Sequence, residues 1–562
     1  MKKLSIIISV ILVSILLPEQ IANGCTNFLI TKGASKDGSV MITYSADSHL
    51  LYGELYYWPA KNWSAGSMVD IYEWDTGKYL GKIPQKAHTY SVVGNMNQHQ
   101  LSIGETTFTG RTELIDTTGI IDYGTLIYFT LQRAKNAREA IYTFSQMLTD
   151  HGYASTGESF SIADANEAWI LELIGKGPGK KGAVWVARRI PDGYISGHAN
   201  HPRIAKFPLA DGIKSITSKE LDKIYNPEVE TVYAYDVIDI AREFGWFDGQ
   251  DKDFSFSDIY APLDFGSARF CEARIWSGFN MVNSQMGTYL DYAMGENLNN
   301  RIPLWIKPDK KIGPKEVMGM MRNYFQGTPM DMTKDIGAGP YGSTVRWRPM
   351  EWTVDGVTYF NERAISTQQT GFSFIAQSRS WLPDPVGGIF WFGVDDTYYT
   401  VYSPMYCGIT RVPETFAVGN GDMMTFSDNA AFWVFNQVTN FVYTRTQPMI
   451  GELQKKQADL ENGFMDEIVN IDKSAEALYN KKPSKAAKYL TEYSVNAGNK
   501  TVMQWKELYK FLFTKYVDGN VKEKQPVPPG YKYGVPKLSQ PGYSEEWYRA
   551  IVNSTGDKFK ER

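Results

Sequence analysis

The chain has 562 residues, of which 43% are hydrophobic and 14% aromatic, and it carries a formal net charge of −4 at pH 7. This length and apolar content predict a globular protein with one large core and appended elements, or with two or three domains. No run of basic residues indicates a nucleic-acid partner, and beyond the N-terminal segment no apolar stretch predicts a membrane-spanning helix.

The N-terminus has the pattern of a secretory signal peptide. Two lysines precede an apolar run over residues 4–17, and small residues follow at 22–24. The run is too short for a stable transmembrane helix, and the small residues suit cleavage by a signal peptidase. We therefore expect residues 1–24 to be a signal peptide that is cleaved after Gly24, and the mature chain to be secreted or periplasmic.

Cleavage at that point would make Cys25 the first residue of the mature chain. Such a residue carries a thiol nucleophile and a free α-amine, with pKa values near ~8.5 and ~8, so the amine can act as the general base for the thiol. Two other interpretations stay open. Cys25 can be a lipoprotein anchor, although Ala22 stands where an aliphatic residue is usual, or cleavage falls elsewhere and Cys25 only starts a strand.

The other two cysteines are Cys271 and Cys407. An odd number of thiols in an oxidising compartment leaves at least one unpaired, and Cys25 is the natural candidate. Spacing does not tell whether Cys271 and Cys407 pair.

The first half of the chain predicts layered α+β structure. Residues 37–38, an Asp-Gly pair, predict a hairpin turn between the first two strands. A helical repeat over 122–152 is restarted by a capping box, Asn136 with Glu139, and is ended by Gly152. Apolar residues on both faces of later strands imply sheets that are covered on both sides. The predicted strands are 26–30, 39–44, 91–95, 100–106, 160–163, 168–174, 182–190 and 194–198.

The pattern changes near residue 428. Apolar residues recur at helical spacing from there to residue 465, and again over 484–493 and 501–516. The segment from Gln525 onward lacks periodicity and is rich in proline. We therefore expect a helical C-terminal extension over 428–562 that ends in an irregular tail.

Several common catalytic signatures are missing from the sequence. The six histidines form no His-Glu-x-x-His set, and His198 and His201 lie in an extended segment before Pro202, which is poor geometry for metal ligands. No phosphate-binding loop and no Gly-x-Ser-x-Gly elbow is present. We expect neither a metal nor another cofactor.

A nucleophilic Cys25 needs groups that hold its amine, orient it and stabilise an oxyanion. Asp47 ends the second strand of the first hairpin and can return beside the amine, although it can also be an ordinary strand-end residue. Asn200 can donate to an oxyanion, or can simply form a turn before a proline. Arg269 and Arg274 lie in what we interpret as an apolar strand, where an arginine implies a carboxylate partner.

Short motifs, in order along the chain, also give it a family resemblance. They include Cys25-Thr26-Asn27, Ala34-Ser35-Lys36-Asp37-Gly38-Ser39, Asp47-Ser48, Gly94-Asn95-Met96-Asn97, Gly104-Glu105-Thr106, Leu131-Gln132-Arg133-Ala134, Glu167-Ala168-Trp169 and residues 197–204, 327–331 and 387–393. With these motifs the chain resembles the dipeptidase A-type (secernin-related) cysteine peptidases, which are N-terminal nucleophile (Ntn) hydrolases. The resemblance covers most of residues 25 to about 450.

The resemblance implies an αββα sandwich of two antiparallel sheets between helical layers, with the peptidase domain over 25–427. It implies hydrolysis of dipeptides or very short peptides by the Cys25 thiol. By analogy with related Ntn amidases, Asp47 would hold the amine and Asn200 would line the oxyanion hole. Either Arg269 or Arg274 would be the active-site arginine.

Four further residues are candidates for contacting the substrate, namely Tyr44, Glu105, Thr106 and Glu172. Relatives carry an arginine three residues before the aspartate, where this chain has Tyr44, so Tyr44 either replaces it as a hydrogen-bond donor or changes specificity. Glu105 and Thr106 lie nearest the expected second oxyanion donor. Glu105 and Glu172 are the acidic candidates for binding a substrate ammonium, although Glu172 can equally be a solvent-facing strand residue.

Two alternative functions stay open. The first is an Ntn amidase that cleaves non-peptide amides of the penicillin or bile-salt type. The second is a lipid-anchored surface protein that keeps the fold without turnover. The sequence does not predict side-chain preference, oligomeric state or physiological role.

Overall fold

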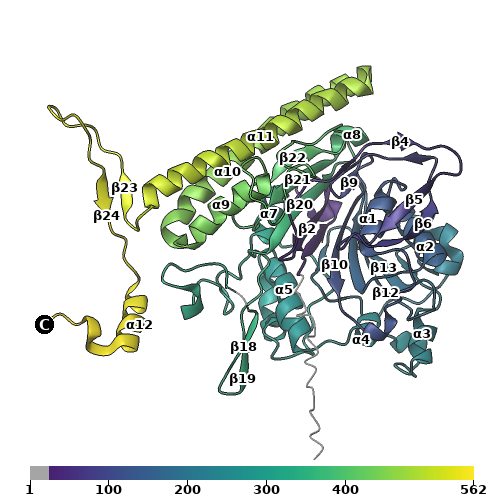
Figure 1. The fold of residues 1–562 in the computed structure, drawn as a ribbon. Coiled ribbons are helices and arrows are strands. Elements are labelled where there is room, and N and C mark those ends of the chain that lie inside the picture. The colour runs from purple at the N-terminus through teal and green to yellow at the C-terminus, as the bar shows by residue number, and fades with distance from the viewer. Residues whose placement is uncertain (1–23, 348) are drawn as a thin grey trace, which may run out of the picture.

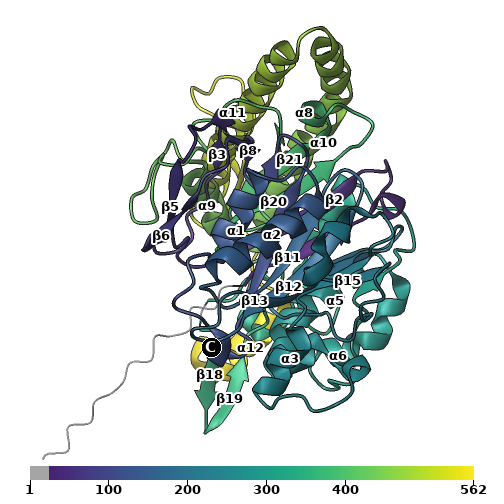
Figure 2. The ribbon, with the colours of Figure 1, turned by 90° about the vertical axis from the view of Figure 1, so that its right-hand side faces the viewer.

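The computed structural model describes residues 24–347 and 349–562. Apart from Gly24, the predicted signal peptide lies outside the described residues. The described chain is a mixed α+β structure in which two large sheets carry helices on their outer faces (Figures 1 and 2). The predicted α+β class is therefore confirmed.

The first large sheet has seven strands, in the order β17-β14-β1-β2-β20-β21-β22, and all of its neighbours are antiparallel. Its strands are β1 (Asn27–Ile30), β2 (Val40–Asp47), β14 (Ile195–His198), β17 (Trp305–Ile306), β20 (Thr370–Ser378), β21 (Ile389–Val394) and β22 (Ser403–Tyr406).

The second large sheet has nine strands, in the order β15-β16-β13-β12-β11-β10-β9-β8-β3. Only its edge pair β15–β16 is parallel. Its strands are β3 (Tyr57–Trp58), β8 (Val92–Val93), β9 (Met96–Asn97), β10 (Ser102–Phe108), β11 (Gly157–Ala163), β12 (Ala168–Gly175), β13 (Ala183–Arg189), β15 (Ser215–Thr217) and β16 (Thr231–Tyr233).

The two large sheets pack face to face. Strand β2 contacts β10 and β11, and β1 contacts β10, β11 and β12. All residues of β1, β2, β11, β12 and β20 are buried, as expected for strands that are covered on both faces. The main core of the protein lies between the sheets and under the helices that cover them.

Helices cover both outer faces. On the nine-stranded sheet lie α1 (Tyr123–Leu131) and α2 (Ala137–His151), which contact β10, β11 and β13. On the seven-stranded sheet lie α7 (Pro314–Met321), α9 (Ala431–Tyr443), α10 (Thr446–Lys481) and α11 (Pro483–Tyr516). In the described ranges no helix combines the length and the apolar content that crossing a membrane requires.

The remaining elements are short. Four two-stranded sheets are formed by β4 (Lys61–Asn62) with β7 (His88–Thr89), β5 (Met68–Tyr72) with β6 (Tyr79–Pro84), β18 (Glu351–Val354) with β19 (Val357–Phe360), and β23 (Val521–Glu523) with β24 (Lys537–Ser539). The shorter helices are α3 (Val237–Glu243), α4 (Phe256–Tyr260), α5 (Ala273–Asn280), α6 (Leu290–Ala293), α8 (Asp384–Gly387) and α12 (Glu545–Thr555).

The N-terminal hairpin and the capped helix follow their local sequence signals. Strands β1 and β2 pair antiparallel through Leu29 and Ile42, and Gly38 in the connecting loop has φ = 81°. Helix α2 begins where the Asn136 side chain accepts a hydrogen bond from the Glu139 backbone at 2.9 Å, and it ends at Gly152 with φ = 75°.

The predicted strand over residues 267–276 is wrong. This segment is a π-helical turn, Ser267–Glu272, that continues directly into α5. Its alanines, arginines and glutamate are strong helix formers, and no period-two alternation opposes them. Arg269 and Arg274 therefore lie on a helix rather than on a strand, five positions apart.

The C-terminal helices are longer than predicted. Segments 484–493 and 501–516 are parts of one helix, α11, because the polar residues between them continue the same helical repeat. Helix α11 packs on α9 through Phe435 and Trp505, whose rings stack 4.9 Å apart.

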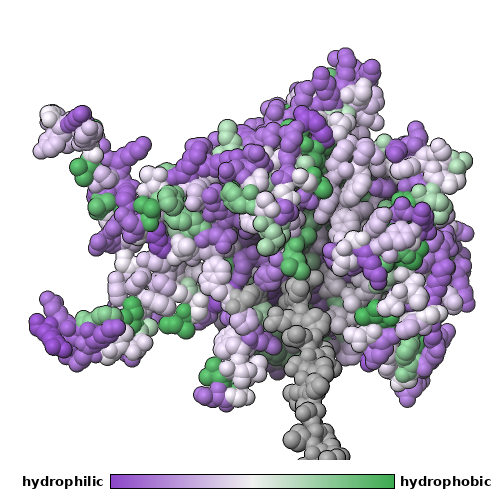
Figure 3. Space-filling view, in the orientation of Figure 1, coloured by the Kyte–Doolittle hydropathy of each residue, from purple (hydrophilic) through white to green (hydrophobic). Residues whose placement is uncertain are grey.

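The tail is also more regular than predicted, because it contains the β23–β24 hairpin and α12. It extends from the body of the protein and carries exposed apolar side chains on its surface, among them Tyr531, Val535 and Val552 (Figures 1 and 3).

Candidate active site

Cys25 lies two residues before β1 and lines a cavity of about 640 Å³. The residue is buried, with 7% of its surface exposed. Strand β2, strand β10 and helix α1 supply much of the wall, so the cavity opens where the two large sheets and one helix meet. The lining side chains used below are Tyr44, Asp47, Glu105, Thr107, Tyr123 and Tyr128.

The backbone of Cys25 is held by two polar side chains. Its nitrogen donates to Asn200 Oδ1 at 2.8 Å, and its carbonyl oxygen accepts from Arg274 Nη1 at 2.5 Å. Arg274 also donates to Asn200 Oδ1 at 2.7 Å and to Thr26 Oγ1 at 2.9 Å. The Arg274 guanidinium therefore fixes both the cysteine and the amide that faces its nitrogen.

Asn200 adopts a backbone conformation that few residues tolerate. Its φ is 57°, in the left-handed region that asparagine enters more readily than most residues. Its Nδ2 donates to the Thr107 carbonyl at 2.7 Å, so both ends of the amide are engaged. This turn after β14 aims the amide oxygen at the Cys25 nitrogen.

Asp47 is held by a residue that the sequence patterns did not single out. Its Oδ2 forms an ion pair with Arg363 Nη2 at 2.7 Å, and its Oδ1 accepts from Thr370 Oγ1 at 2.7 Å. Arg363 also donates to the Gly24 carbonyl at 2.6 Å, and the Gly24 nitrogen donates to the Asp47 carbonyl at 2.9 Å. Asp47 and Arg363 therefore both form hydrogen bonds with Gly24, the residue directly before Cys25.

The Cys25 thiol lies among acidic and phenolic groups. Its Sγ is 3.8 Å from Tyr44 Oη and 4.0 Å from Glu105 Oε1, and Tyr44 Oη donates to the same Glu105 oxygen. Burial, together with the charges of Glu105 and Asp47, raises the pKa of the Cys25 thiol well above its ordinary value. The thiol is therefore protonated at neutral pH while Cys25 remains an internal residue, and it needs a base to react.

Glu105 forms a buried carboxyl pair with Glu158. Burial raises the pKa of both groups, and their mutual repulsion favours a shared proton. Thr107 Oγ1 donates to Glu158 Oε1 at 2.8 Å, whereas Oε2 of Glu105 and Oε2 of Glu158 receive no hydrogen bond from any other described residue. A buried acceptor of this kind favours a cationic or hydrogen-bonding ligand.

Aromatic side chains form part of the cavity wall. The rings of Trp74 and Tyr128 stack 4.5 Å apart, and Tyr56 meets both edge-on. Tyr123 Oη donates to Asp75 Oδ1 at 2.7 Å, and burial raises the pKa of Asp75. The high aromatic content was the only sequence signal for this wall.

The structure brings six of the nine predicted site residues together and separates the other three from them. Cys25, Tyr44, Asp47 and Glu105 line the cavity, and Asn200 and Arg274 contact Cys25 directly. The predicted residues away from the cavity are Thr106, whose Oγ1 lies 2.7 Å from His198 Nδ1, Arg269, which pairs with Glu362, and Glu172. Strand alternation explains Thr106, because its neighbours Glu105 and Thr107 face the cavity.

Glu172 is bonded to the backbone in the core. Its two carboxylate oxygens accept from the backbone N–H groups of Arg203 at 2.5 Å and Ile204 at 2.9 Å. Among the described residues, no group of three or more His, Cys, Asp or Glu side chains is arranged to hold a metal ion.

We expect Glu172→Ala to lower stability and to leave KM unchanged. The substitution strands two buried N–H groups, which costs about 2–4 kcal/mol in unfolding free energy. Burial raises the pKa of Glu172 from 4.5 to about 8. Between these pH values the folded protein keeps a proton that the unfolded protein releases, so the wild-type protein loses stability as the pH rises. Denaturant unfolding at pH 5 and pH 8 should therefore show the larger gap between wild type and variant at pH 5. A raised KM with normal stability would instead place Glu172 at the substrate.

The comparisons with known proteins identify the family of the chain. The profile described as Peptidase family C69 matches residues 55–459, and the chain belongs to this family of peptidases. The resemblance predicted from the motifs is thus confirmed. A "Probable dipeptidase" of Salmonella dublin is 23% identical over 413 residues, covering 68% of this chain and 81% of that protein.

Two streptococcal proteins are similar over longer stretches. A "Probable dipeptidase B" of Streptococcus pyogenes serotype M1 is 21% identical over 532 residues, covering 90% of this chain and 96% of that protein. A "Probable dipeptidase A" of the same organism is 23% identical over 433 residues, covering 72% and 79%.

Proposed function

We propose that the protein is an exported cysteine dipeptidase of the Ntn class, and that cleavage after Gly24 exposes Cys25 as its N-terminal nucleophile. One observation carries the proposal. The Cys25 nitrogen lies 2.8 Å from Asn200 Oδ1, and the Cys25 thiol lines the main cavity. A free α-amine at this nitrogen would keep its acceptor and lie beside the thiol that it must deprotonate.

The stacked sheets support the same assignment. Two antiparallel sheets between helical layers, with the cysteine at the start of a central strand, are what the αββα Ntn sandwich requires. We propose residues 25–427 as the catalytic unit and 428–562 as its helical extension.

The proposed reaction begins when the α-amine takes the proton from Cys25 Sγ. The thiolate adds to the substrate carbonyl carbon, and the resulting tetrahedral intermediate collapses as the ammonium returns the proton to the leaving amine. Water then adds to the thioester, with the amine again as base, and releases the acid and the free thiol.

Three residues hold the amine and thiol in place for this reaction. Asn200 Oδ1 accepts an N–H of the amine, Arg274 fixes Asn200 and the Cys25 carbonyl, and Tyr44 Oη lies beside Sγ, where relatives are expected to carry an arginine. Burial and the charge of Arg363 lower the pKa of Arg274 to about 10, so Arg274 remains a cation at neutral pH. The Oδ1 of Asn200 accepts from the Cys25 nitrogen and its Nδ2 donates to the Thr107 carbonyl, so Nδ2 is not free to donate to an oxyanion. Asn200 is therefore better suited to hold the amine than to line the oxyanion hole, the role predicted for it.

The cavity fits a short peptide with a free N-terminus. A volume of about 640 Å³ lies within the usual range for small-molecule sites, and aromatic side chains supply part of the cavity wall. The Glu105 carboxyl group lines the cavity, with Oε1 4.0 Å from Cys25 Sγ, and supplies an acceptor for a substrate ammonium. The names of the relatives point to the same substrates, dipeptides.

We expect Glu105→Gln to lower kcat/KM for free dipeptides. Removing the charge that faces the ammonium costs about 2–5 kcal/mol, which is at least about thirtyfold in kcat/KM. Because burial raises the pKa of Glu105, the wild-type carboxylate is lost at a higher pH than an ordinary glutamate, so KM should rise as pH falls through the raised pKa. The exposed Glu113→Gln serves as a matched control.

A substrate panel separates the proposal from the amidase alternative. Purified protein that starts at Cys25 should cleave free dipeptides and reject their N-acetyl forms. Preference for a penicillin or bile-salt amide, or equal turnover of N-acetyl dipeptides, would assign the protein to the amidases instead.

A further inference from the structure

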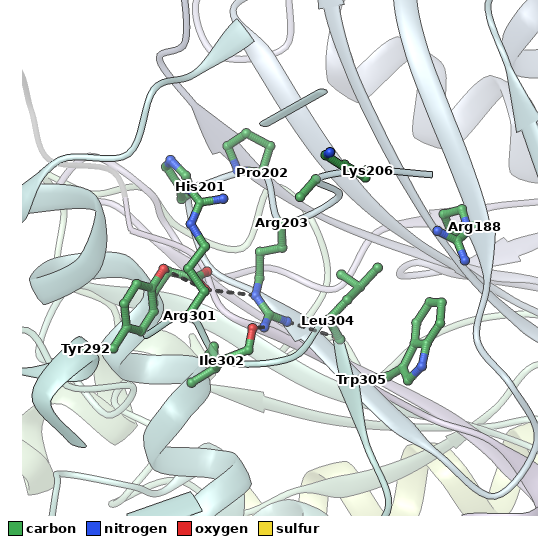
Figure 4. Close-up of a pocket in the computed structure, with 12 residues that line it drawn as sticks. Arg188, His201, Pro202, Arg203, Lys206, Tyr292, Arg301, Ile302, Leu304 and Trp305 are labelled. Atoms are coloured by element: carbon green, nitrogen blue, oxygen red, sulfur yellow. Dashed lines mark hydrogen bonds and ion pairs between the residues drawn. The ribbon is translucent and has the colours of Figure 1, made fainter. Parts of the chain in front are cut away.

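A second cavity, of about 300 Å³, shares no lining residue with the Cys25 cavity. Arg188 of β13 and Trp305 of β17 form one side of this second cavity, and His201, Arg301 and Tyr292 form the other (Figure 4). Four cationic residues line it, counting Arg203 and Lys206, against one acidic residue. The formal charge of its lining residues is therefore positive.

Three of the four cations are already neutralised. Arg203 Nε pairs with Glu272 Oε2 at 3.0 Å, and its remaining nitrogens donate to backbone carbonyls such as Gly197 O and Pro303 O, both at 2.7 Å. Lys206 pairs with Asp253 at 3.0 Å, and Arg301 pairs with Asp258. The charges of these three side chains are therefore compensated within the protein.

Arg188 differs from the other three. No described residue gives its guanidinium a hydrogen bond or an ion pair, and its Nε is shielded from solvent without an acceptor. The guanidinium lies over the Trp305 ring, 5.0 Å from the ring centroid. Burial lowers the pKa of Arg188 and the charge of Glu230, which forms no ion pair with it, partly opposes this shift, so the arginine stays protonated at neutral pH. A half-buried, unpaired cation is unfavourable and favours an anion in the adjoining space.

The rest of the lining indicates the kind of anion. Pro202, Ala205, Ile302 and Leu304 supply apolar surface next to the charged groups. A cavity of about 300 Å³ is several times larger than an inorganic anion needs, and its apolar wall gains from burying a hydrocarbon body.

We propose that the second cavity binds a small organic carboxylate. The two carboxylate oxygens pair with the fork of the Arg188 guanidinium, and the apolar body packs against Trp305 and Leu304. This inference does not depend on the peptidase activity, because no residue of the second cavity contacts Cys25.

Titration calorimetry on the full chain tests the proposal with sodium 4-methylpentanoate as the probe. We expect saturable one-site binding in the millimolar range or tighter, no binding of the neutral isostere 4-methylpentanamide, and weaker binding of inorganic phosphate. Arg188→Gln should weaken the probe at least about tenfold, the loss expected for a bidentate charge-assisted pair. Arg189→Gln is the matched control, because Arg189 pairs with Glu230 and does not line this cavity.

A second variant guards against misfolding of the first. Ala205→Trp fills the cavity without a change of charge and should also abolish binding, while the melting temperature reports whether each variant is folded. If both Arg188→Gln and Ala205→Trp bound the probe as tightly as the wild-type protein does, the probe would bind elsewhere and the proposal would be overturned. Equal binding of the amide, tighter binding of phosphate, or no detectable binding at millimolar concentrations would overturn it as well.

Discussion

Replacing Cys25 by alanine is expected to abolish peptide hydrolysis, with a loss in kcat on the order of 10⁴-fold or more. Cys25→Ser should retain at most about 1%, because a hydroxyl is a far weaker nucleophile at neutral pH. Because burial raises the pKa of the Cys25 thiol, the thiol of the wild-type protein also needs an adjacent base to react. Initial rates on a free dipeptide, normalised to folded protein, measure both effects.

Two controls separate loss of the nucleophile from general damage. Cys407→Ala alters another buried thiol, remote in sequence and outside the cavity, and should leave kcat unchanged. A chain with one extra residue before Cys25 keeps the thiol but converts the amine into an amide, which is no base, so it should be inactive. Full activity of the extended chain would rule out the amine as general base.

Arg274→Met is expected to lower kcat/KM on the order of 10²-fold, the second largest effect. The substitution frees Asn200 and the Cys25 carbonyl from the guanidinium that holds them, and a displacement of about 1 Å at a reacting group costs this much. The rate at which iodoacetamide alkylates the Cys25 thiol should also differ between Arg274→Met and the wild-type protein, because the substitution alters the surroundings of the thiol while the protein stays folded.

Arg269→Met is the matched control for this variant. Arg269 lies five residues earlier on the same helical segment, but it pairs with Glu362 and makes no contact with Cys25. Its loss should lower the melting temperature with little change in kcat/KM. Equal losses in activity from the two variants would mean that Arg274 acts through the fold rather than through the site.

Local sequence signals predicted the elements that place the nucleophile. The Asp-Gly turn at 37–38 and the alternation around it gave the β1–β2 hairpin, and thus the positions of Cys25 and Asp47 at its open end. The capping residue Asn136 likewise marked the start of α2. Such features depend on neighbouring residues, so they can be deduced from the chain alone.

Features that depend on distant contacts were missed. Arg363 pairs with Asp47 across 316 positions, and no motif marks it. The aromatic wall joins Trp74 to Tyr128 through tertiary packing alone. The roles of Arg269 and Arg274 could not be separated from the sequence, because only the helical geometry aims Arg274 at Cys25 and turns Arg269 toward Glu362. Glu172 resembled a site residue because a buried carboxylate in a strand has no pattern that marks its backbone partners.

The mass of the N-terminal peptide of the active, exported protein tests most directly whether Cys25 is the N-terminal nucleophile. We expect the first residue to be Cys25 with an unmodified amine and thiol, and activity to appear only when this terminus is present. A diacylglyceryl adduct on Cys25, or full activity in a chain that begins at any other residue, would contradict it.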